Sequence, residues 1–75
     1  MEKKQYRLYV DYSGKTYISK IMVFTEDQRK KYEELILKVI NLEVETFSFY
    51  GDTSTYYFTK GALKNSVLIL KEERV

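Results

Sequence analysis

The segment from residue 25 to residue 41 carries the only long helical pattern in the chain, and this constrains the fold more than any other feature. Its apolar side chains recur at i, i+3, i+4, i+7 and i+8 and form one stripe: Tyr32, Leu35, Ile36, Val39 and Ile40. Thr25 and Gln28 have the spacing of a capping box, which favours a helix that begins directly after Thr25. The pattern predicts one amphipathic helix that packs on a sheet.

Five segments around this helix have the composition of β-strands, because β-branched and aromatic residues are bounded by turn residues. They cover residues 5–12, 16–24, 43–50, 55–60 and 66–72. Gly14 and Gly51 mark the turns of two hairpins, and a connector precedes the last strand. We therefore expect an α+β fold, a single antiparallel sheet of four to five strands packed with one α-helix in the order ββαβββ, over one domain of residues 1–75.

The register of the first hairpin is open at this level. A two-residue turn and a three-residue loop with a bulge at Gly14 are both compatible with the sequence. A shift of one residue moves every side chain of a strand to the other face. The two turns therefore predict opposite faces for Tyr17.

Most of the expected strands are apolar on both faces. In the second strand, Ile18, Met22 and Phe24 are expected on one face, and Tyr17, Ile21 and Val23 on the other. The last strand sets Val67 and Ile69 against Leu68 and Leu70. One helix is about 10 Å wide and covers roughly two or three strands. Either the sheet closes on itself, or another molecule covers the excess; we favour an interface.

Catalysis has little support in the composition. The chain has no cysteine and no histidine, which excludes disulfides and thiolate metal sites and removes the commonest general base. No spacing forces Asp11, Asp52, Glu43 or Glu45 into a shared cleft, and Asp residues in turns usually bind their own backbone. We expect no enzyme activity, no cofactor and no metal site.

Charge and hydropathy predict a cytoplasmic protein without a membrane segment. The net charge is only +2, from 13 basic and 11 acidic residues. The longest uncharged run, residues 53–59, is too short to span a bilayer. The segment Met1–Glu2–Lys3–Lys4 is not followed by the apolar stretch of a signal peptide.

These features favour a small non-catalytic protein-binding module that docks on a larger host protein or on a second copy of itself. The bias toward Lys, Glu, Tyr and Ile is typical of proteins encoded by phages and mobile elements of AT-rich bacteria, which suggests an inhibitor or regulator that acts by steric docking. The expected contact residues are Tyr9, Tyr17, Tyr56 and Tyr57, with Arg7 and Lys20 at the rim.

The alternative is a nucleic-acid-binding accessory protein. The first hairpin interleaves cations with tyrosines, and such side chains contact phosphates and stack on bases. We rank this second, because the small net charge is far from the excess typical of dedicated nucleic-acid binders and because lysines on edge strands also discourage aggregation.

Overall fold

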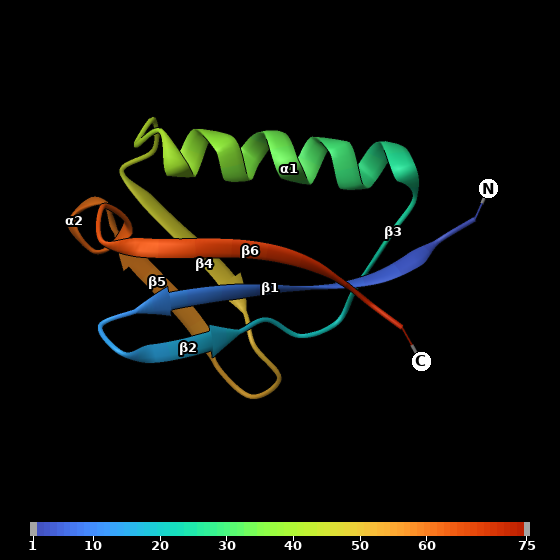
Figure 1. Ribbon diagram of the computed structural model, residues 1–75, viewed down its shortest axis with the longest axis horizontal. Helices are drawn as coiled ribbons and strands as arrows, with labels where there is room; N and C mark the ends of the chain where they lie inside the picture. The colour runs from blue at the N-terminus through green and yellow to red at the C-terminus, as the bar shows by residue number, and fades with distance from the viewer. Residues whose placement is uncertain (1, 75) are drawn as a thin grey trace.

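The computed structural model describes residues 2–74 and has an α+β fold with antiparallel sheets. In chain order, the elements are β1 (Lys4–Tyr12), β2 (Lys15–Ile18), β3 (Met22–Phe24), α1 (Glu26–Ile40), β4 (Thr46–Tyr50), β5 (Thr55–Thr59), α2 (Lys60–Leu63) and β6 (Ser66–Glu73) (Figure 1). The expected class and element order are confirmed, with the second strand divided in two and the connector folded into α2. Met1 and Val75, the ends of the expected domain, lie outside the described residues.

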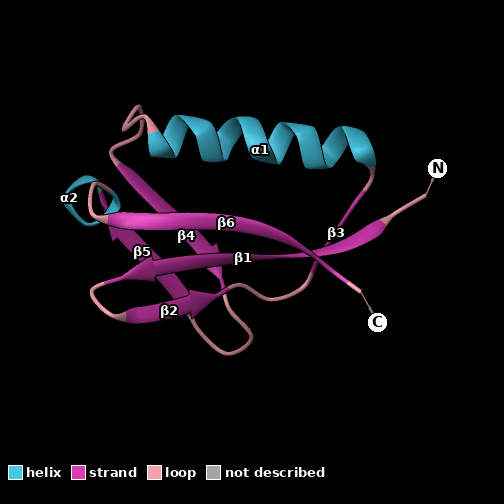
Figure 2. Cartoon of the chain, in the orientation of Figure 1, coloured by secondary structure: helices cyan, strands magenta, loops and turns pink. Residues whose placement is uncertain are grey.

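The strands belong to two sheets, where a single sheet was expected. In the larger sheet, β1 is central, with β6 along one side and β2 and β3 in succession along the other. β4 and β5 form a separate hairpin that crosses behind β1 and β6 (Figure 2). This division has a physical reason: the hairpin turns Phe47, Phe49 and Phe58 toward the larger sheet and buries them, which one flat sheet under one helix would not achieve.

The first hairpin has a two-residue turn. Ser13 has φ 53° and Gly14 has φ 79°, and Tyr12 pairs with Lys15. Positive φ at both central residues is the geometry that matches the twist of a hairpin. Tyr17 therefore lies opposite Val10 and faces the core.

A one-residue bulge separates β2 from β3. The five residue steps from Tyr17 to Met22 lie opposite the four steps from Val10 to Tyr6, so one extra residue is accommodated between them. One extra residue in a strand reverses the face to which all the following side chains point. The expectation that Ile18 and Met22 share a face is therefore wrong: Ile18 points outward with Tyr9, whereas Met22 packs against the core.

Helix α1 begins as the sequence predicts. The Thr25 hydroxyl accepts a hydrogen bond from the Gln28 backbone, and the Gln28 side chain accepts one from the Thr25 backbone, which completes the capping box. At the other end, Leu42 has φ 58° and its N–H donates to Val39, an arrangement that glycine usually occupies. Only Ile36 and Val39 of the expected stripe are buried, and Leu35 and Ile40 remain exposed.

One core lies between the two sheets and the helices. Leu8 and Val10 of β1 meet the buried residues of α1 and α2 and the phenylalanines of the hairpin. The members of this cluster are Leu8, Val10, Ile36, Val39, Phe47, Phe49, Phe58 and Leu63. The inward face of β1 contributes Leu8 and Val10, and the other members come from α1, α2 and the β4–β5 hairpin. None of the described helices has the length and apolar character needed to cross a membrane.

Candidate protein-binding surface

The other side of the larger sheet carries a row of apolar side chains. Ile18 of β2, Tyr9 of β1 and Ile69 of β6 are partners in the strand register and lie side by side across three strands. Ile69 is 48% exposed and Ile18 is 39% exposed, and no helix or strand among residues 2–74 packs over them. Val67, 59% exposed, extends the row along β6. We call these four side chains, with Arg7, Asp11, Lys71 and Glu73 around them, the outer sheet face.

The charges of the outer sheet face are mixed in sign. Asp11 lies beside Val67 on one flank of the line of Ile18, Tyr9 and Ile69, and Arg7 and Lys71 lie on the other flank. The Asp11 carboxylate accepts a hydrogen bond from the Thr16 hydroxyl at 2.7 Å, which fixes it on the sheet. An apolar centre with a polar rim of both signs is the usual composition of a protein–protein interface.

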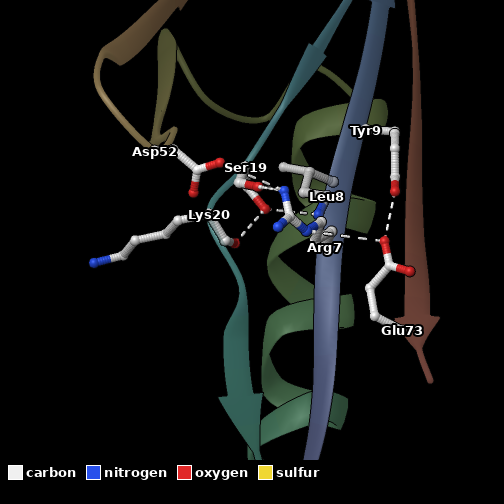
Figure 3. Close-up of polar contacts among 7 residues, drawn as sticks. All are labelled: Arg7, Leu8, Tyr9, Ser19, Lys20, Asp52 and Glu73. Carbon is white, nitrogen blue, oxygen red and sulfur yellow. Dashed lines mark hydrogen bonds and ion pairs between the residues drawn. The ribbon is translucent and has the colours of Figure 1, made fainter. Parts of the chain in front are cut away.

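Tyr9, Arg7 and Glu73 form a polar network that fixes the central tyrosine (Figure 3). The Tyr9 hydroxyl donates to a Glu73 carboxylate oxygen at 2.5 Å, and the Arg7 guanidinium lies 4.0 Å from the same oxygen. The hydrogen bond with Glu73, with a smaller effect of desolvation, raises the pKa of Tyr9 above its ordinary value. The ring of Tyr9 is therefore held in one orientation before any partner binds.

Arg7 also connects the larger sheet to the loop of the β4–β5 hairpin. Its guanidinium lies 3.7 Å from the Asp52 carboxylate and donates to the Ser19 carbonyl at 3.3 Å (Figure 3). Two carboxylates thus surround this cation. These two carboxylates reduce the attraction between the Arg7 guanidinium and a phosphate group.

Ser19 closes the bulge beneath this network. It is 1% exposed, and its hydroxyl accepts a hydrogen bond from the Leu8 N–H at 2.8 Å and donates to the Lys20 carbonyl at 2.8 Å. Its own N–H donates to the Leu8 carbonyl at 2.9 Å. Both backbone groups of Leu8 therefore remain paired although the strand is interrupted there.

Lys20 joins the hairpin to the sheet edge. Its N–H donates to the Tyr50 carbonyl at 2.8 Å, and its ammonium lies 5.4 Å from the centre of the Tyr50 ring. That distance permits a cation–π contact. Lys20 and Tyr50 form one margin of the surface near Arg7.

The structure brings together only part of the expected contact set. Arg7 and Tyr9 lie on the outer sheet face, with Lys20 at its margin. Tyr17 and Tyr56 face inward and contact each other with ring centres 5.2 Å apart. Tyr57 is 78% exposed, but it lies on the hairpin face that points away from the larger sheet.

The residues that the expected contact set omitted are aliphatic. Most of the apolar row consists of Ile18, Val67 and Ile69. The expected contact set contained only tyrosines and cations and therefore did not include them. The alternation of Val67 and Ile69 with Leu68 and Leu70 already indicated two apolar faces in the last strand. The alternation of apolar residues within one strand does not predict strand pairing, so it did not indicate that Ile18 lies beside Tyr9.

The surface offers recognition by packing and hydrogen bonding. Within residues 2–74, no three acidic side chains lie close enough together to hold a metal ion. No family model, no curated protein and no solved structure matches this chain, so comparison with known proteins assigns it to no family.

Proposed function

We propose that this chain is a small, non-catalytic protein-binding module that docks on a larger protein through the outer sheet face. The supporting observation is the uncovered row of Ile18, Tyr9 and Ile69 in the middle of the larger sheet. Contiguous exposed apolar surface on a small domain usually marks an interaction site. The fixed Tyr9 ring would be the central anchor, because ordered aromatic residues lose little entropy on binding.

In its finer form, the proposal is that docking occludes a functional surface of a host protein in the cytoplasm. The composition typical of phage and mobile-element proteins supports an inhibitor or regulator. Steric occlusion needs no reacting groups, only an interface of sufficient size and complementarity. The row lies on three paired strands, which suits this mode because a surface that is already ordered loses little entropy on binding.

A nucleic-acid partner ranks second. The cation nearest the apolar row, Arg7, is surrounded by the carboxylates of Asp52 and Glu73, and Asp11 lies on the same face. A phosphate backbone would meet these negative charges. A protein with mixed rim charges fits the surface better.

The test is capture of host proteins by immobilised wild-type protein and three variants. We expect a protein that is retained by the wild type and by Tyr57→Ala and lost by Tyr9→Ala and Ile69→Asp. With that partner purified, Tyr9→Ala should weaken the affinity about 30-fold or more, which corresponds to a central anchor residue. Tyr57→Ala is the matched control, because it removes an exposed tyrosine from the hairpin instead.

Circular dichroism establishes that the variants are folded before their binding is compared. Equal retention of the same protein by all four chains would contradict the outer sheet face as the docking site. Light scattering of the wild type alone detects a second copy as the partner. Binding to DNA that falls steeply with salt would favour the nucleic-acid alternative.

A further inference from the structure

Strand β6 has one free edge, and the hydrogen bonds of Leu8 show which of its backbone groups point to that edge. Both the N–H and the carbonyl of Leu8 bind Ser19, on the β2–β3 side of β1. In a strand, successive residues direct these groups to opposite sides. The neighbouring residues of β1, Arg7 and Tyr9, therefore direct theirs to β6.

The strand register carries this alternation to β6. Arg7 pairs with Lys71 and Tyr9 pairs with Ile69, so Lys71 and Ile69 direct their backbone groups to β1. The N–H and carbonyl groups of the alternate residues Leu68, Leu70 and Glu72 point away from the sheet. Within residues 2–74, none of these three has a backbone hydrogen bond to a further strand, loop or side chain.

Over its first half, the free edge of β6 carries few of the features that usually protect an edge strand. Its charged residues, Lys71, Glu72 and Glu73, lie at the far end, and α1 runs beside the edge without a backbone hydrogen bond to it among residues 2–74 (Figure 1). The eight residues of β6 contain no proline, and its pairing with β1 is continuous from Ser66 to Glu73. From Val67 to Leu70 it is aliphatic on both faces. The opposite edge of the sheet is interrupted by the bulge and bound by the hairpin at Lys20. An unprotected aliphatic edge is a template for strand addition.

A groove of about 310 Å³ lies beside this edge, between β6 and α1. Its walls are Leu70 of β6 and Glu33, Ile36 and Leu37 of α1. α1 runs alongside β6 (Figure 1). Leu37 is 58% exposed, and no element among the described residues covers it. Apolar side chains of an added strand would pack in this groove against Leu70 and Leu37.

We propose that the β6 edge is a second protein-binding site, which takes an extended aliphatic segment of a partner protein as an additional strand. Backbone hydrogen bonds with Leu68, Leu70 and Glu72 would supply affinity, as in other complexes formed by strand addition. One side chain of the segment packs between Leu70 and Leu37. The site is distinct from the outer sheet face and does not depend on it.

A second copy of the chain does not fit this edge. Antiparallel pairing of β6 with its counterpart would relate the two copies by a two-fold axis perpendicular to the sheet, beside β6. Because α1 lies beyond β6, this axis would carry the second α1 to the region behind β1, which β4 and β5 occupy (Figure 1). A single extended segment carries no second helix into that region.

Amide hydrogen exchange, measured residue by residue by NMR, tests the proposal. In the free protein, the amides of Leu68, Leu70 and Glu72 should exchange at least tenfold faster than those of Ile69 and Lys71, which serve as internal controls. The probe is a synthetic peptide of alternating valine and isoleucine flanked by lysines, with a proline-substituted version as its control. At a concentration of ten times its Kd, the peptide should slow exchange of the three edge amides about tenfold.

Two leucine variants on α1 locate the groove. Leu37→Asp should abolish peptide binding, whereas Leu35→Asp, on the other flank of the same helix, should leave it unchanged. Both variants should still bind an outer-face partner, so the two proposals fail separately. Slow exchange of the edge amides in the free monomer, no protection by the peptide, or protection that arises only as the protein dimerises would each overturn the proposal.

Discussion

At the scale of single residues, Ser19 has the largest structural consequence. A bulge leaves backbone groups of the neighbouring strand without their usual partners. Here the Ser19 hydroxyl accepts the hydrogen bond of the Leu8 N–H, which a backbone carbonyl would accept in an uninterrupted strand. The site is buried, so water cannot take over this role. No sequence pattern indicated it, because a serine between Ile18 and Lys20 is equally compatible with an uninterrupted strand.

Ser19→Ala should destabilise the protein by about 1–3 kcal/mol, because it leaves the Leu8 N–H buried without an acceptor. Urea unfolding followed by circular dichroism measures the change in free energy. Ser48→Ala is the control, since Ser48 is exposed on the hairpin, and its effect should stay within about 0.5 kcal/mol. Equal effects of the two substitutions would refute the role assigned to the Ser19 hydroxyl.

At the scale of elements, the turn between β4 and β5 requires a small residue. Gly51 is buried, and its N–H donates to the Ser54 carbonyl at 2.6 Å. A Cβ atom there would lie 2.8 Å from the Tyr56 ring and 3.2 Å from the Ser54 carbonyl oxygen. Close packing against Tyr56 and the backbone is therefore what selects glycine at this turn.

Gly51→Ala should cost about 1–3 kcal/mol of unfolding free energy, because the added methyl group overpacks the turn. Gly61→Ala, in α2, should instead stabilise the protein by up to about 1 kcal/mol, since alanine favours helix and the nearest atom is 3.9 Å away. Thermal and urea unfolding of both variants should shift in opposite directions. A tolerated alanine at position 51 would contradict the packing argument.

The elements also show how far a sequence prediction reaches. Thr25 and Gln28 predicted the start of α1 correctly, because a capping box is local chemistry. The faces of Ile18 and Met22 were mispredicted, because alternation assumes an uninterrupted strand and the bulge depends on a tertiary hydrogen bond of Ser19. Among the expected contact residues, Tyr9 lies on the outer face, whereas the inward direction of Tyr17 was decided by a turn geometry that the sequence left open.

At the scale of the whole molecule, aromatic contacts hold the two sheets together. The Phe58 ring of the hairpin lies 5.4 Å from the Tyr17 ring and 6.3 Å from the Tyr12 ring, both edge-to-face. It also stacks on Phe49 at 5.9 Å. Few backbone hydrogen bonds cross between the sheets, so aromatic packing, which includes the Phe58 contacts and the Tyr17–Tyr56 pair, connects them.

Phe58→Ala should lower the unfolding free energy by about 3–5 kcal/mol, because it opens a cavity between the sheets. Tyr57→Ala, one residue away but exposed, should change it by less than about 0.5 kcal/mol. Near- and far-ultraviolet circular dichroism of the wild type should give one coincident transition. Separate transitions would mean that the hairpin unfolds on its own.

The pairing of β1 with β6 also has a consequence for biosynthesis. Gln5 and Glu73 are partners in this register, so β1 is translated long before the strand with which it pairs. Until β6 has emerged from the ribosome, β1 lacks the strand with which it makes its longest pairing. Contacts between such distant positions form slowly compared with those of a helical bundle. This part of the nascent polypeptide is therefore most vulnerable to misassembly and proteolysis before β6 leaves the exit tunnel.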